Sequence, residues 1–78
     1  MATTHTYTIL DKRIEGDTIA TDISIQFSGD YNEEVLTSIY HFRPQTVEEI
    51  ESNIEIRIAT ELERLQVKET MQNILNQL

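Results

Sequence analysis

The chain of 78 residues has no cysteine, no tryptophan, one proline and two glycines. Without cysteine it can form no disulfide, no thiolate metal site and no thiol redox centre. The two glycines, Gly16 and Gly29, are isolated, which excludes a glycine-rich loop that cradles phosphate. Stability therefore has to come from one small hydrophobic core, and we expect help from partner subunits.

Positive charge is also scarce. Six Lys and Arg residues stand against 14 Asp and Glu residues, so the formal net charge is −8. Proteins that bind nucleic acid need clustered Lys and Arg to displace counterions from phosphates. No such cluster occurs in this sequence, and we expect no nucleic acid among its partners.

Long hydrophobic runs are absent as well. The first residues, Met1 to His5, contain neither a charged leader nor an apolar run, and no segment approaches the length of a membrane span. We therefore expect no signal peptide, no membrane contact and synthesis in the cytoplasm. No repeat or linker divides the chain, so residues 1–78 are predicted to form a single domain.

The sequence before Pro44 alternates between apolar and polar residues. The alternation is clearest over residues 18–27, where one row of side chains consists of Ile19, Thr21, Ile23, Ile25 and Phe27. A period of two over this length is typical of a strand with one buried face.

Two further strands are predicted on either side of this one. The first covers residues 4–14 and pairs antiparallel with the second through a turn at 15–17. Its alternation slips between Ile9 and Ile14, which a β-bulge near residues 11–13 would reconcile. The third covers residues 35–43 and carries apolar side chains on both faces: Val35 and Ile39 on one, Leu36, Tyr40 and Phe42 on the other.

A helix start follows Pro44. Thr46 and Glu49 fit a capping box, in which the Thr46 hydroxyl accepts from the Glu49 N–H and the Glu49 carboxylate accepts from the Thr46 N–H. Apolar residues then recur at steps of three and four: Val47, Ile50, Ile54, Ile58, Leu62 and Leu65. This stripe predicts a helix that begins at Val47 and covers one face of the sheet.

The predicted fold class is α+β, with a three-stranded antiparallel meander over residues 1–43 followed by one long C-terminal helix over 46–78, in the order β-β-β-α. The residues expected in the core are Ile23, Ile25, Phe27, Ile54, Ile58 and Leu62. For Ile25, a position at a looser rim of the core is the alternative. Tyr31 and Tyr40 are also expected in the core, with interface anchors as the alternative.

A second apolar stripe begins in the last third of the predicted helix. At about 100° per residue, it projects from the side opposite the first stripe, and its residues are Val67, Met71, Ile74, Leu75 and Leu78, with Ile56 on the same side. Either the chain bends near Gln66, or one helix continues with a stripe that its own sheet cannot reach. We favour the continuous helix because no Gly or Pro marks a break. Such a stripe predicts a protein partner.

No motif for metal binding or catalysis is complete. Asp30, Asn32 and Glu34 have the first spacings of a calcium loop, but Val35 stands where that loop needs Gly. We expect no metal and no cofactor.

The histidines and serines give the same result. His5 and His41 are predicted on the two outer strands, which do not neighbour each other, so they are not expected to share an ion. No serine lies in a glycine-flanked nucleophile elbow, and adjacent carboxylates such as Glu48 and Glu49 point different ways. We expect no enzymatic activity.

In its layout the chain resembles small structural proteins of tailed bacteriophages. The resemblance rests on the run from Ile23 to Asn32 (ISIQFSGDYN), the run from His41 to Ile50 (HFRPQTVEEI) and the Glu- and Arg-rich helix that follows. It implies a role in the virion, in the head, neck or tail, and it assigns no functional residue.

Two functions are therefore considered. The first is a non-enzymatic assembly protein of a phage particle that acts as a homo-oligomer or within a larger virion assembly. The alternative is a small acidic inhibitor that imitates DNA at a basic host site, as anti-restriction and anti-CRISPR proteins do. An imitator of DNA needs carboxylates in line on one exposed face, whereas the acids here are spread over turns, strands and the helix start.

Overall fold

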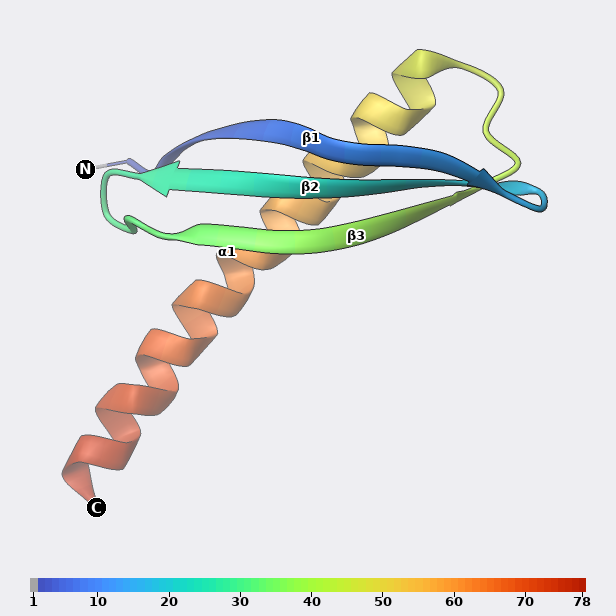
Figure 1. Cartoon of the computed structure of the whole chain (residues 1–78). Coiled ribbons are helices and arrows are strands. Elements are labelled where there is room, and N and C mark those ends of the chain that lie inside the picture. The colour runs from blue at the N-terminus through green and yellow to red at the C-terminus, as the bar shows by residue number, and fades with distance from the viewer. Residues whose placement is uncertain (1) are drawn as a thin grey trace.

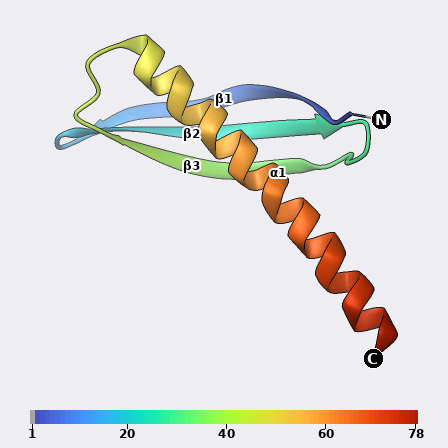
Figure 2. The ribbon, with the colours of Figure 1, turned by 180° about the vertical axis from the view of Figure 1, so that it is seen from behind.

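The computed structural model describes residues 2–78. Three strands, β1 (Thr4–Glu15), β2 (Thr18–Ser28) and β3 (Glu34–Phe42), form one antiparallel sheet in the order β1-β2-β3, and a single helix, α1 (Val47–Gln77), follows them. The helix crosses one face of the sheet diagonally and continues well beyond it (Figures 1 and 2). The predicted β-β-β-α meander is confirmed.

The β1–β2 hairpin turns at Gly16 and Asp17, where Gly16 has a φ of 61° that favours glycine. A register shift lies between Ile9 and Asp11. The predicted bulge is therefore present, one residue earlier than expected, at Leu10. It places Asp11, Arg13 and Glu15 on the face that the helix leaves uncovered.

The core lies between α1 and the covered face of the sheet. Its buried members are Ile23, Ile25, Phe27, Ile39, Ile54 and Ile58, and half-buried side chains around it include Tyr7, Tyr31, Val35, Ile50, Leu62 and Leu65. Five of the six predicted core residues are buried, and Leu62 is half-buried.

Ile25 lies in the core as predicted, whereas Val47, the first residue of the predicted helix stripe, lies outside it. Ile25 is fully buried and does not lie at a rim, because Tyr7 and Val35 flank it on the neighbouring strands and the helix packs above. Val47 is 65 % exposed, because the diagonal course of α1 carries its first turn past the β1 edge of the sheet (Figure 2). Of the two tyrosines, Tyr31 packs against the core while Tyr40 is exposed on the uncovered face.

The helix begins as the capping signal predicts. The Thr46 hydroxyl accepts from the Glu49 N–H at 3.2 Å, but the Glu49 carboxylate accepts from the N–H of Gln45, not of Thr46. The reciprocal bond of the capping box is thus displaced by one residue.

The helix then runs without a break through Gln66 to Gln77, so the prediction of one continuous helix is confirmed. Its 31 residues span about 46 Å at 1.5 Å per residue. The whole molecule measures 48 × 25 × 17 Å, so the helix accounts for its elongated shape.

Candidate partner-binding surfaces

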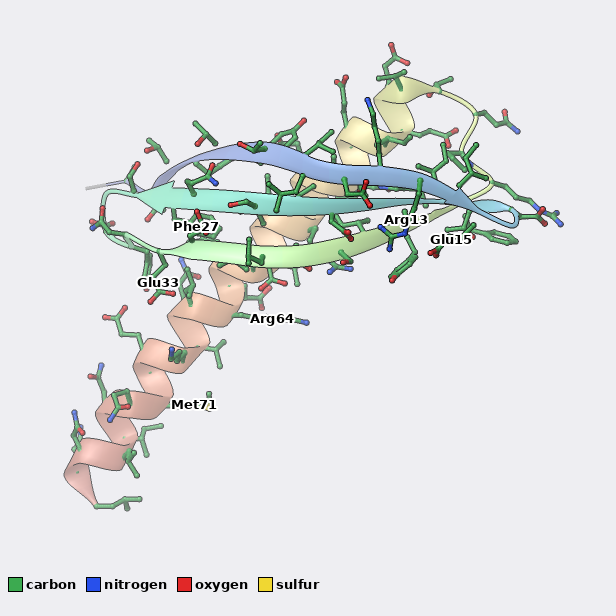
Figure 3. The ribbon with its side chains drawn as sticks, in the orientation of Figure 1. Arg13, Glu15, Phe27, Glu33, Arg64 and Met71 are labelled. Carbon is green, nitrogen blue, oxygen red and sulfur yellow. The ribbon has the colours of Figure 1, made fainter. Side chains whose placement is uncertain are left out.

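The projecting part of α1 exposes the predicted second stripe. The exposed fractions are 49 % for Val67, 57 % for Met71, 56 % for Ile74, 61 % for Leu75 and 97 % for Leu78. Met71 lies where the helix has passed beyond the sheet (Figure 3). The structure thus brings these five residues together on one helix segment, where the part of the chain that the structure describes leaves them uncovered.

Helical geometry places most of the stripe opposite the core-facing side. At about 100° per residue, Val67, Met71, Ile74 and Leu78 lie within about 60° of one another, and Leu75 lies at the edge of this group. Ile56, 62 % exposed, continues the same side toward the start of the helix. A shallow groove on this side is lined by Thr60, Glu63, Arg64, Val67 and Met71.

A hydrogen bond from Tyr31 connects this segment to the rest of the chain. The Tyr31 hydroxyl donates to the Glu69 carboxylate at 2.6 Å, and this bond raises the pKa of the tyrosine. Thr3, Asp30, Leu62 and Gln66 line a polar cleft beside it. The bond ties the loop between β2 and β3 to α1 just where the helix leaves the sheet.

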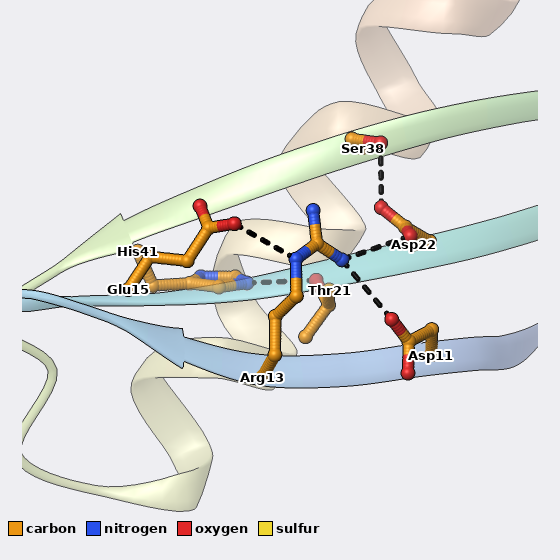
Figure 4. Close-up of polar contacts among 7 residues, drawn as sticks. All are labelled: Asp11, Arg13, Glu15, Thr21, Asp22, Ser38 and His41. Carbon is orange, nitrogen blue, oxygen red and sulfur yellow. Dashed lines mark hydrogen bonds and ion pairs between the residues drawn. The ribbon is translucent and has the colours of Figure 1, made fainter.

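The uncovered face of the sheet forms a second surface, and its centre is Arg13 (Figure 4). The guanidinium donates to Glu15 at 2.9 Å, to Asp22 at 2.9 Å and to Asp11 at 3.2 Å. The hydrogen bonds that Arg13 donates to Glu15 and Asp22 raise the pKa of its guanidinium, so the group stays charged. The Ser38 hydroxyl donates to Asp22 at 2.6 Å, and together with Arg13 it lowers the pKa of that carboxyl. The network crosses all three strands.

Apolar side chains of β3 lie beside this network. Leu36 is 68 %, Tyr40 60 % and Phe42 71 % exposed. They pair with small residues of β2: Leu36 lies opposite Ser24 and Tyr40 opposite Ala20. Both small residues are buried. The Arg43 guanidinium lies 5.0 Å from the centre of the Phe42 ring, in a cation–π contact at the end of the strip.

The outer edge of β3 is partly closed by α1. The Phe27 N–H of β2 donates to the Glu33 carbonyl. In an antiparallel ladder, the backbone groups of successive residues point alternately toward and away from the neighbouring strand. Counting from Glu33 along β3, the backbone groups of Ser38 point away from β2, toward the outer edge. Arg57 donates to the Ser38 carbonyl at 3.3 Å and to the Thr37 hydroxyl at 2.8 Å. A helix side chain thus occupies an acceptor that an added strand would need.

The two histidines lie far apart. His5 pairs with Phe27 and His41 with Ile19, and eight residues of strand span about 27 Å. Among residues 2–78, no group of three or more His, Asp or Glu side chains is placed to hold a metal ion. No helix in the same part of the chain is long and apolar enough to cross a membrane.

His41 has a structural environment. It is 1 % exposed beneath the helix, and burial lowers the pKa of its imidazole. Asn53 donates from its amide to Nδ1 at 3.0 Å, which leaves the proton on Nε2, 3.0 Å from the Thr21 hydroxyl. His5 is exposed and lies 3.2 Å from Glu55.

The Arg13 network was not predicted from the sequence. Asp11, Arg13 and Glu15 occur at every second position, which places them on one face of a strand. That spacing is the signal that would have revealed the network. The buried position of Glu61 on the helix was also missed; its carboxylate accepts from Arg64 at 3.0 Å.

No protein-family model, no curated protein and no solved structure matches this chain.

Proposed function

We propose that this chain is a non-enzymatic structural or assembly protein that binds protein partners through the outward stripe of its projecting helix, defined by Val67, Met71, Ile74, Leu75 and Leu78. The observation that carries this proposal is the exposure of these apolar side chains on a helix that extends beyond its own sheet. Leaving such a stripe in water forgoes about 25 cal/mol for each Å² of apolar surface that a partner would cover. Exposed apolar stretches of this kind mark interaction sites.

We further propose that the assembly is a virion. The support is the resemblance in layout to small structural proteins of tailed bacteriophages, together with an elongated shape suited to bridging between subunits. The proposed function requires no metal, cofactor or catalytic group.

The distribution of acids favours this function over that of an inhibitor that imitates DNA. An imitator presents unpaired carboxylates in line, whereas Asp11, Glu15 and Asp22 surround Arg13, and Asp17 accepts from Arg43 at 3.0 Å. These acids are therefore partly neutralised within the chain.

A single charge on the stripe tests the proposal. Met71→Glu places a carboxylate in the middle of the stripe, while Asn73→Glu places the same charge two residues later on another side of the helix. Tagged copies are supplied during phage infection and purified particles are assayed for them. We expect the wild type and Asn73→Glu to co-purify with particles and Met71→Glu to be lost, although circular dichroism shows both variants folded. Equal incorporation of all three would refute the role of the stripe, and failure of the wild type to co-purify would refute the virion role.

A further inference from the structure

The spacing within the outward stripe is that of a coiled-coil seam. The steps from Val67 to Met71, Ile74 and Leu78 are four, three and four residues, which assigns Val67 and Ile74 to heptad position d and Met71 and Leu78 to position a. Thr60 and Arg64 continue the seam toward the sheet as d and a. A seam of this kind is recognised by another helix with the same repeat.

Charge favours other copies of this chain as the occupants. Residues 66–78 contain one Lys and one Glu, so the side chains of this segment carry no net charge in a chain of −8. Repulsion between copies is therefore weakest where the apolar seam lies.

Two charged residues flank the seam and indicate its direction. Glu63 falls at position g and Lys68 at the following position e, and neither has a hydrogen-bond or ion-pair partner within residues 2–78. Within one helix they cannot meet, because only residues three or four apart are neighbours. In a parallel coiled coil, position g of one helix lies beside the next position e of the other, so Glu63 meets Lys68 of a second copy.

The antiparallel arrangement lacks this complementarity. Placing Val67 against Met71 of a second, antiparallel copy keeps the apolar layers together but brings the two Lys68 side chains opposite each other. Like charges in that position are unfavourable.

The shapes of the seam residues favour more than two helices. Position d carries β-branched Val67 and Ile74, while position a carries Met71 and Leu78, which are unbranched at Cβ. This distribution shifts parallel coiled coils from dimers to trimers and tetramers. Leu75 at position e widens the apolar face in the same sense. The sheets do not obstruct the bundle, because they pack on the opposite side of α1 through Ile54 and Ile58.

We infer that the stripe joins three or four copies of this chain in a parallel helical bundle, with the sheets together at one end and Glu63 of each copy paired with Lys68 of the next. This inference rests on the proposed function, since it names the partner of the same surface.

Sedimentation equilibrium of the purified full chain gives the first test. We expect a mass three or four times 9.1 kDa, and a monomeric mass for Met71→Glu at the same concentration. Glu63→Lys and Lys68→Glu should each raise the midpoint concentration of dissociation about tenfold. The double variant Glu63→Lys/Lys68→Glu should restore it, and only contact between copies explains such a rescue.

The parallel direction of the helices in the bundle is tested by adding Gly-Gly-Cys after Leu78, in a chain with no other cysteine. A parallel bundle forms disulfides between the added cysteines in a mild redox buffer, whereas an antiparallel bundle holds them apart. A monomeric or dimeric mass, absence of rescue, or absence of the disulfide would overturn the inference. If the isolated chain is monomeric while Met71→Glu still abolishes incorporation into particles, the proposed function stands and the self-association falls. If Met71→Glu is incorporated normally, the proposed function itself falls.

Discussion

The two halves of α1 share one backbone and one spacing of apolar residues but have different surroundings. In the half that crosses the sheet, Ile54 is 0 % and Ile58 2 % exposed, whereas in the half that projects, Met71 and Ile74 remain more than half exposed. The first half is held by burial, and the second by the helix's own hydrogen bonds and the Tyr31–Glu69 contact. Short helices without packing are marginal in water. The same three-and-four spacing therefore specifies a buried core in one half and an exposed apolar stripe in the other.

The largest expected effect comes from removing packing in the first half. Ile54→Ala and Ile58→Ala should each lower the free energy of unfolding by about 2–4 kcal/mol, because each leaves a cavity in a small core. Met71→Ala is the matched control in the second half and should change it by less than about 0.5 kcal/mol at concentrations where the chain is monomeric. Urea denaturation followed by circular dichroism measures all three. Similar losses for Met71→Ala and Ile58→Ala would show that the two halves do not differ in burial.

A smaller effect is expected from pH, and it concerns the first half, where Asn53 contacts His41. Burial lowers the pKa of His41 below its usual value of 6.5, so the unfolded chain binds this proton more readily than the folded chain. The contribution of His41 to the free energy of unfolding is therefore at its full value above pH 6.5 and decreases as the pH falls below 6.5.

Urea denaturation at steps between about pH 7 and pH 5 measures this dependence, above the range in which most carboxyls titrate. His41→Gln has no titrating ring and serves as the control. We expect a flatter profile for that variant, whatever its absolute stability. If the free energy of unfolding depended on pH equally in the wild type and in His41→Gln, His41 would not be the source of the dependence.

The smallest effect on stability is expected at the junction of the two halves. Tyr31→Phe removes the hydrogen bond to Glu69 and keeps the ring against the core. The free energy of unfolding should fall by only about 0.5 kcal/mol, since the bond is exposed. Amide hydrogen exchange of the monomer should nevertheless become faster in residues 66–78 and stay unchanged in residues 50–62. Glu69→Gln, which keeps an acceptor for the hydroxyl, should show less of this change. Faster exchange in both halves alike would indicate that Tyr31 supports the whole helix.

Much of the fold was predictable because its signals are local. The alternation around Ile23 and Ile25 specifies β2, and the Thr46 cap with the stripe through Ile58 specifies the start and the buried side of α1. The outward stripe followed from helical periodicity alone, and its exposure is as expected, while its partner remains a prediction.

The remaining features depend on register and crossing angle, which periodicity does not fix. Arg13 reaches Asp22 because the bulge at Leu10 shifts the pairing by one residue. Val47 is exposed because α1 crosses the sheet diagonally. The burial of His41 depends on Asn53 and Thr21, which are distant from each other in sequence.

The contact between Arg57 and the Ser38 carbonyl limits how copies of this chain can grow into larger objects. Any association through the helix raises the local concentration of sheets, and exposed strand edges at high concentration extend one another into fibrils. On β3 the guanidinium occupies the middle of the edge, and on β1 the bulge at Leu10 interrupts the regular ladder. Neither edge offers an unbroken template for an incoming strand. Growth by sheet extension is therefore disfavoured, and the parallel bundle inferred above would end at a finite number of copies.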